Sequence, residues 1–127
     1  MLIETTLEEM KDDSSWCQVW NIKGTSDTNL NDVLDPDRAY DSADDLSIDP
    51  LVFDDIEELL ASVNGDGDGE DWSCIVKMKD GRFAFVTAGC DYTGWDCQAG
   101  GRSFVAASLE ELRFYCLSAR EQERLEV

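Results

Sequence analysis

Acidic side chains are the residues whose type and spacing point most directly to a function for this chain. Asp and Glu account for 29 of its 127 residues, against 10 Lys and Arg, which gives a net charge of −19. Residues 1–71 hold 21 of the acidic residues and 3 of the basic ones, whereas residues 72–127 are nearly neutral. Because repulsion at this charge density opposes folding, we expect the charge to serve the binding of a basic partner. An acidic solvating tail is the alternative interpretation.

Residues 50–63 contain the densest acidic run, and we predict that they form a helix. Asp49 and Pro50 are typical of a helix N-cap and first position, and Asn64-Gly65 is typical of a helix end. Apolar residues recur between them with helical spacing, so one stripe would be buried and carboxylates three and four positions apart would be exposed. The predicted partner-binding carboxylates are those of Asp41, Asp44, Asp45, Asp49, Asp54, Asp55, Glu57 and Glu58.

Catalytic chemistry is limited by the absence of histidine. Ser-His-Asp and Cys-His catalysis are excluded, and the commonest metal ligand is missing. A pair of carboxylates can still transfer protons, but pairs arise by chance among 29 acidic residues, and none lies in a recognisable pocket motif. We therefore expect a protein that is not an enzyme and has no cofactor.

The Gly- and Asp-rich segment 64–71 is similar to the first half of an EF-hand calcium loop. Its oxygen ligands would be Asn64, Asp66 and Asp68, with Gly69 at the sharp turn. The twelfth position, where a bidentate Glu is required, is Ile75, and a predicted strand follows in place of a helix. We interpret the segment as a flexible acidic loop without a metal, and weak calcium binding is the alternative.

Five cysteines raise the question of disulfides and zinc. A disulfide between Cys90 and Cys97 across a hairpin is conceivable, but without a secretion signal reduced thiols are expected. The cysteine spacing does not suit a zinc site either. We expect Cys17, Cys74 and Cys116 to be small core residues.

The elements that position these residues predict one α+β domain. Alternating apolar residues predict strands over residues 16–22, 72–79, 82–88 and 102–107. Asp80-Gly81 is a strong hairpin signal, and helices are predicted over residues 2–13 and, after the capping box that begins at Ser108, over 108–124. The antiparallel sheet would have three or more strands and be covered by the C-terminal helix, with the acidic helix alongside or opposite. Residues 24–49 are polar and are expected to form a loop.

The length of the chain suits a single domain, in which an acidic part, residues 1–71, is displayed on a scaffold formed by residues 72–127. No apolar stretch approaches the roughly 20 residues that a membrane span needs. The N-terminus has no basic region followed by an apolar run, so no signal peptide is expected. A cytoplasmic location follows as an expectation.

Tyr92 and Trp95 lie among Gly, Thr and Asp, where exposed aromatic residues are typical binding anchors. The alternative is that they fold back to cover the end of the sheet. The surrounding segment, Ala88-Gly89-Cys90-Asp91-Tyr92-Thr93-Gly94-Trp95-Asp96-Cys97-Gln98, resembles a segment of small uncharacterised phage and bacterial proteins. This resemblance implies a phage or mobile-element origin and assigns no functional residue. In charge alone, the chain is also similar to phage DNA-mimic inhibitors and to acidic immunity proteins that block nucleases.

The leading hypothesis is an acidic inhibitor or nucleic-acid mimic that binds a basic nucleic-acid-binding protein, because such proteins hold DNA in grooves lined with Lys and Arg. In a phage this would be an anti-defence protein, directed against a CRISPR effector or a restriction enzyme in the host cytoplasm. The alternatives are an immunity-type inhibitor of a toxin nuclease, a calcium-binding module, and an adaptor whose Tyr92 and Trp95 dock a neutral partner. Direct binding to nucleic acid or to a membrane is not expected.

Overall fold

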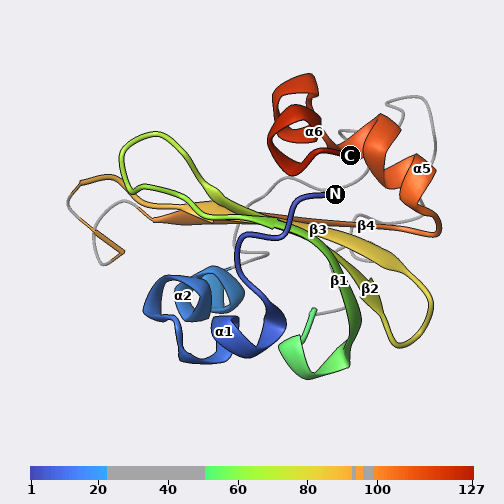
Figure 1. Ribbon diagram of the computed structural model, residues 1–127, viewed down its shortest axis with the longest axis horizontal. Coiled ribbons are helices and arrows are strands. Elements are labelled where there is room, and N and C mark those ends of the chain that lie inside the picture. Colours follow the sequence, from blue (N-terminus) through green and yellow to red (C-terminus); the bar gives the residue numbers. More distant parts are fainter. Residues whose placement is uncertain (23–50, 93, 96–98) are drawn as a thin grey trace, which may run out of the picture.

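The computed structural model describes residues 1–22, 51–92, 94–95 and 99–127 of the chain. Four antiparallel strands form one sheet, and short helices lie on both sides of it (Figure 1). This arrangement confirms the predicted α+β fold, while the predicted loop 24–49 lies outside the described residues. In chain order the elements are helices α1 (Leu7–Asp12) and α2 (Ser14–Ile22), the 3₁₀ turn η1 (Phe53–Asp55), strands β1 (Ile56–Val63), β2 (Trp72–Met78), β3 (Phe83–Gly89) and β4 (Gly100–Ala106), helix α5 (Leu109–Glu111), the π-helix η2 (Leu112–Cys116) and helix α6 (Ala119–Leu125).

The sheet is a simple meander, in which the strand order β1-β2-β3-β4 follows the sequence. The hairpin between β2 and β3 turns at Asp80-Gly81, where Gly81 has a φ of 94°, a conformation that glycine adopts without strain. In the centre of the sheet Ile75 pairs with Phe85, and Phe85 pairs with Phe104. The three strands predicted between residues 72 and 107 are confirmed, with ends that differ by at most two residues.

Both faces of the sheet are buried, each against a different group of helical segments. On one face, Trp16 of α2 shares a core with Val76 and Val86. On the opposite face, Leu125 of α6 shares a second core with Phe85. The C-terminal segment therefore covers one apolar face, as predicted. The layer formed by α1 and α2 on the other face is a feature that the sequence pattern does not predict.

The helix predicted over residues 50–63 is wrong, because these residues form η1 and the edge strand β1. Pairing with β2 skips one residue between Ile56 and Glu58 and another between Leu59 and Ala61. Each of these bulges shifts the alternation of side chains by one position. Ile56 and Leu59 consequently belong to the core beside α1 and α2, and Ala61 belongs to the opposite core. Apolar residues three and four positions apart thus arise in a strand, although their spacing is that of a helix.

The strand predicted over residues 16–22 is also wrong, because this segment forms helix α2. Trp16, Val19 and Trp20 are all buried, and their i, i+3, i+4 spacing is that of one helix face. Asp13 Oδ1 accepts the backbone N–H of Trp16 at 3.0 Å, which caps the start of the helix. Of the helix predicted over residues 2–13, only the part that forms α1 is confirmed. This helix begins at a capping box formed by Thr6 and Glu9.

The predicted C-terminal helix is present but interrupted. The hydroxyl of Ser108 accepts the backbone N–H of Glu111, as expected of an N-cap. Helix α5 continues directly into the π-helix η2, and the helical conformation ends at Leu117, before α6 begins. Gln122 of α6 donates its amide to the carbonyls of Arg113 at 3.1 Å and Leu117 at 3.3 Å, which satisfies groups that the break leaves open. None of the helices in the described part of the chain is long and apolar enough to cross a membrane.

The first residues of the chain join the edge of the sheet to α6. The backbone of Ser62 in β1 donates to Leu2 at 2.8 Å and accepts from Glu4 at 3.0 Å, and Leu2 donates to Leu125 at 2.9 Å. The hydroxyl of Ser62 is buried and also bonds to both backbone groups of Thr5. The acidic part before residue 71 is therefore built into the same sheet and cores as the rest of the described chain.

Candidate functional site

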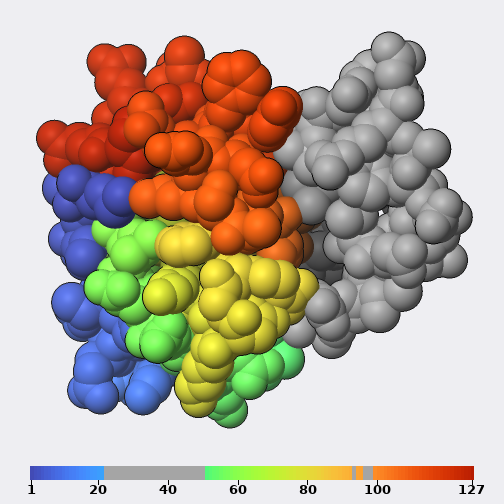
Figure 2. Space-filling model, turned by 90° about the vertical axis from the view of Figure 1, so that its right-hand side faces the viewer, coloured from blue at the N-terminus to red at the C-terminus, as the bar shows by residue number. Residues whose placement is uncertain are grey.

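Acidic side chains gather on three neighbouring elements at the β1 edge of the sheet. α1 and η1 lie on the same side of the sheet in Figure 1, and the N-terminal residues (blue) and the residues after 50 (green) share one surface in Figure 2. Apolar packing joins them, because Leu7 and Phe53 both pack on the core that contains Met10 and Ile56. The exposed carboxylates of this region, which we call the acidic surface, are those of Glu8, Glu9, Asp12, Asp13, Asp54, Asp55, Glu57 and Glu58.

Some carboxylates of the acidic surface have roles inside the chain. Glu9 and Asp13 accept backbone N–H groups at the starts of α1 and α2. Glu8 and Glu57 lie 3.9 and 3.6 Å from their nearest lysine ammonium groups. Both of these ion pairs are exposed, so each contributes about 1 kcal/mol or less. The lysines therefore neutralise only a small part of the surface.

The remaining carboxylates of the acidic surface are those of Asp12, Asp54, Asp55 and Glu58. They make no hydrogen bond or ion pair within the described residues. Asp54 and Asp55 are held by η1, and Glu58 follows the first bulge of β1, so a turn and a strand display them in place of the predicted helix. Charges and bulges on an edge strand also hinder pairing with other chains, which is a second role for the same residues.

Several predicted binding carboxylates have no described position. Residues 41, 44, 45 and 49 lie outside the described residues, so the contribution of Asp41, Asp44, Asp45 and Asp49 stays a prediction. The predicted site does not include the acidic residues of α1 or of its C-cap, Asp13. Positions 8, 9, 12 and 13 fall on one exposed side of the helix and its end, and this spacing is a signal that the sequence does contain.

The loop between β1 and β2 is closed by its own polar groups and anchored to α6. Asp66 Oδ1 accepts the backbone N–H groups of Asp68 at 2.7 Å and of Glu70 at 3.0 Å. These two bonds hold the pKa of Asp66 below its ordinary value of 3.8. Glu70 forms ion pairs with Arg120 and, at 3.2 Å, with Arg124. The conformation of the loop is therefore fixed by contacts within the chain.

The side chain of Asn64, the first residue of the calcium-like segment, has a structural role. Its Oδ1 accepts hydrogen bonds from Thr5 Oγ1 at 2.7 Å and from Trp16 Nε1 at 2.9 Å. To bind a cation, this oxygen would have to leave both donors, one of which belongs to a fully buried tryptophan. Among the residues that the structure describes, no cluster of three or more His, Cys, Asp or Glu side chains is placed to hold a metal ion.

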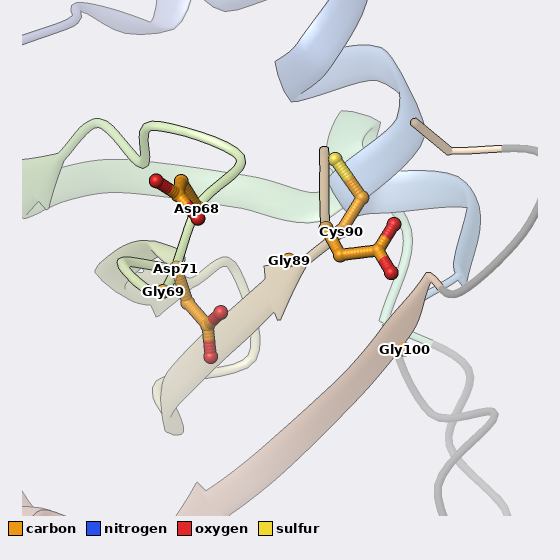
Figure 3. Close-up of a pocket in the computed structure, with 7 residues that line it drawn as sticks. Asp68, Gly69, Asp71, Gly89, Cys90 and Gly100 are labelled. Atoms are coloured by element: carbon orange, nitrogen blue, oxygen red, sulfur yellow. The ribbon is translucent and has the colours of Figure 1, made fainter. Parts of the chain in front are cut away.

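An open hollow of about 450 Å³ lies where this loop meets the ends of β3 and β4 (Figure 3). Asp71 points from the loop toward β3, and its Oδ1 occupies the space that a Cβ of Gly89 would need. Burial raises the pKa of Asp71 above its ordinary value of 3.8, although Arg102 and Arg124 oppose the shift. The hollow is lined by Asp68, Gly69, Asp71, Gly89, Cys90, Asp91 and Gly100.

Replacing Asp71 with asparagine is expected to stabilise the protein at neutral pH. The raised pKa means that the folded chain binds a proton at Asp71 more tightly than the unfolded chain does. Stability from this group therefore increases as the pH falls through the raised pKa, and the full gain is reached below 3.8. Urea unfolding from pH 7 to pH 3 should show Asp71→Asn above wild type at pH 7, with the difference shrinking toward pH 3. A variant that is less stable at pH 7 would contradict this cause.

The two aromatic residues of the β3–β4 loop differ in exposure. The Tyr92 side chain is 86% exposed. Trp95 is half-buried at the margin of a core, and its ring lies 5.2 Å from that of Trp72 between centroids. Trp95 thus follows the alternative interpretation, in which it covers the end of the sheet, and Tyr92 is the residue free to contact a partner. Residues 93 and 96–98 of this segment lie outside the described residues.

The cysteines are distributed between core and surface. Cys74 and Cys116 are buried, which confirms their predicted place in the core, whereas Cys17 is exposed and its predicted burial is wrong. Burial raises the pKa of Cys116 to about 12 and also raises that of Cys74. The pKa of Cys90 is raised by burial and by two neighbouring aspartates. These three thiols are therefore poor nucleophiles. Cys97 lies outside the described residues.

The chain was compared with protein-family models, with curated proteins and with solved structures. None of the three comparisons gives a match. The resemblance of residues 88–98 to small phage and bacterial proteins accordingly stays a prediction. The proposals below depend on the acidic surface and on the described side chains themselves.

Proposed function

We propose that this chain is a non-enzymatic acidic protein that binds a basic, nucleic-acid-binding protein through its acidic surface. The observation that carries the proposal is the group of exposed carboxylates on α1, η1 and β1, of which Asp12, Asp54, Asp55 and Glu58 have no partner within the described residues. These positions belong to a helix, a turn and a paired strand, so the backbone that carries the charges is ordered before a partner arrives.

Electrostatics favour a basic partner over a neutral one. Neighbouring carboxylates repel one another, and a cleft lined with Lys and Arg would relieve this repulsion and accelerate association. Duplex DNA presents about one charge per 1.7 Å of helix axis. The run from Asp54 to Glu58 places four carboxylates within five consecutive residues. A protein that binds DNA phosphates is therefore a suitable partner for this surface.

The biological setting rests on charge and on the resemblance of residues 88–98. In a phage, the partner would be a host defence protein such as a CRISPR effector or a restriction enzyme. In a bacterium, it would be a toxin nuclease, and the chain would act as an immunity protein. An adaptor that docks a neutral partner through Tyr92 is the second candidate, favoured by the 86% exposure of that side chain.

The proposal can be tested by using this chain to capture proteins from bacterial lysate at two ionic strengths. The captured complex is then challenged with duplex DNA. The captured protein should be basic, should dissociate when salt is raised from about 0.05 M to about 0.5 M, and should release this chain when duplex DNA is added. A complex that persists in high salt and binds DNA at the same time would overturn the proposal. If such a complex is lost on Tyr92→Ser, the adaptor candidate is supported.

A further inference from the structure

Two aromatic side chains of the π-helix η2 lie on the surface of the protein. Phe114 is 78% exposed and Tyr115 is 39% exposed. Their rings pack edge to face, with centroids 4.8 Å apart and an interplanar angle of 82°. In this geometry the edge of one ring meets one face of the other, so the remaining aromatic faces are open to a partner.

An open hollow of about 480 Å³ adjoins the aromatic pair, and Glu110, Phe114 and Gln122 are among the residues that line it. The amide nitrogen of Gln122 donates to the backbone carbonyls of Arg113 at 3.1 Å and Leu117 at 3.3 Å. Because both N–H groups of this amide are in use, its oxygen is the atom left to accept a hydrogen bond from a ligand. The carboxylate of Glu110 is exposed and makes no hydrogen bond or ion pair within the described residues.

Carboxylates of the neighbouring helices α5 and α6 lie around η2. Glu111 and Glu121 are close enough to Cys116 of η2 to contribute to the raised pKa of its thiol. With Glu110 they place three negative charges beside η2, whose own charged residue is Arg113. The whole chain carries −19. A cationic partner is therefore attracted to this face, and a second copy of the chain is repelled.

We infer that this face, which we call the η2 face and define by Glu110, Phe114, Tyr115 and Gln122, binds an arginine side chain on a cationic segment of a partner protein. A guanidinium group carries a positive charge, has only hydrogen-bond donors and presents a flat surface that stacks on aromatic rings. The η2 face supplies the matching groups, which are a carboxylate, an amide oxygen and two rings. Attraction between the cation and a ring adds to the ion pair.

Other occupants fit the η2 face less well. An apolar segment would cover the carboxylate of Glu110 without giving it a partner, which is costly. An acidic segment would be repelled by the net charge of the chain. A lysine would pair with Glu110, but its ammonium group lacks the planar surface that stacks on Phe114. The exposed guanidinium of Arg113 opposes any cation, and this predicts the sign of the effect when Arg113 is replaced.

The η2 face is separate from the acidic surface. Leu112 and Cys116 of η2 belong to the core beside α6, whereas Phe53 of η1 packs on the core beside α1 and α2. These two regions therefore lie on opposite sides of the sheet (Figure 1). The inference does not depend on the proposed function, because each site can bind or fail to bind a cation without the other.

Nuclear magnetic resonance of the isotope-labelled full chain, titrated at low salt with a hexa-arginine peptide, tests the inference. The backbone amide signals of residues 110–116 report this face locally, so peptide bound to the acidic surface does not obscure the result. These signals should shift and saturate with a dissociation constant below about 1 mM. A hexalysine peptide of the same charge should bind this face at least about 2-fold more weakly, because its ammonium groups do not stack.

Single substitutions test the three parts of the contact. Phe114→Ser should raise the dissociation constant measured at residues 110–116 about 2- to 5-fold, through loss of one exposed cation–π contact. Glu110→Gln should raise it by a similar factor, whereas Arg113→Gln should lower it, because that guanidinium repels the peptide. Tyr92→Ser removes an exposed ring elsewhere, and Glu58→Gln removes a carboxylate of the acidic surface. These two matched controls should leave the constant unchanged.

Circular dichroism should show the wild-type fold for all of these variants, because the substituted side chains are exposed. The inference would be overturned if the signals of residues 110–116 do not shift with the arginine peptide, or if the lysine peptide binds them equally well. An unchanged constant in Phe114→Ser would exclude the contact with the ring. Weaker binding in Arg113→Gln would also contradict the inference, since the face would then be recognising negative charge.

Discussion

Replacing Trp16 with alanine is expected to lower the free energy of unfolding by about 3–5 kcal/mol. Trp16 is fully buried in the core between α2 and the sheet. Its Nε1 donates to Asn64 Oδ1 at 2.9 Å, which ties α2 to the end of β1. The substitution removes an entire indole from the core and takes a donor from Asn64. Because small domains have total stabilities of about 5–15 kcal/mol, urea unfolding followed by circular dichroism should show a large shift of the midpoint.

A graded set of variants separates the two parts of this effect. Trp16→Phe keeps most of the buried ring and loses the hydrogen bond, so it should cost less than Trp16→Ala. A double-mutant cycle of Trp16→Phe with Asn64→Ala should give a coupling of about 0.5–1.5 kcal/mol, the usual net contribution of one hydrogen bond. If the urea midpoint of Trp16→Ala equals that of wild type, the result would contradict the burial of Trp16 between α2 and the sheet.

The C-terminal half of the fold could be predicted because its signals are local. Asp80-Gly81 predicts a hairpin between two alternating runs, and β2 does pair with β3. The register centres the turn on Asp80, so the loop has three residues, 79–81, in place of the expected two. The four residues from Ser108 to Glu111 likewise contain the complete signal for the start of α5, with Ser108 as the N-cap. The sequence pattern predicts one continuous helix over residues 108–124, although Ser118 and Glu121 form a second capping box that marks the separate start of α6.

The errors in the N-terminal half have long-range causes. The two bulges of β1 exist only in its pairing with β2, and they give a strand the apolar spacing of a helix. In α2, buried Trp16 and Trp20 are four residues apart, a distance that fits both a helix face and an alternating strand. Asp13 at the helix start would have favoured the helix, since aspartate is a preferred N-cap.

The composition of the candidate site could be predicted, but its assembly could not. That negative charge is concentrated in the first 71 residues follows from counting residues. The elements α1, η1 and β1 form one surface because Leu7 and Phe53 pack against a shared core. These two residues are far apart in the sequence, so no local sequence pattern predicts that they meet. Asn64 is a case of the opposite kind. Its position in the calcium-like segment suggests a metal ligand, whereas its side-chain oxygen accepts a hydrogen bond from Trp16 Nε1.

Neutralising four carboxylates of the acidic surface is expected to weaken the capture of a basic partner about 100-fold. The variant is Asp54→Asn, Asp55→Asn, Glu57→Gln and Glu58→Gln, which preserves side-chain shape and polarity. If each exposed charge contributes about 0.7 kcal/mol at the interface, four contribute about 3 kcal/mol, which corresponds to roughly a 100-fold change in the dissociation constant. Titration calorimetry at low salt against the captured partner measures the change.

A matched control removes the same number of charges elsewhere on the molecule. Asp68→Asn, Glu111→Gln, Glu123→Gln and Glu126→Gln neutralise exposed carboxylates outside the acidic surface, so any general effect of net charge appears equally in both variants. The stability of the surface variant should lie within about 1 kcal/mol of wild type, because its only described ion pair, Glu57 with Lys77, is exposed. If the surface variant binds as tightly as the control but aggregates, the carboxylates of β1 protect the sheet edge and do not recognise a partner. Loss of binding in the surface variant alone assigns recognition to this edge.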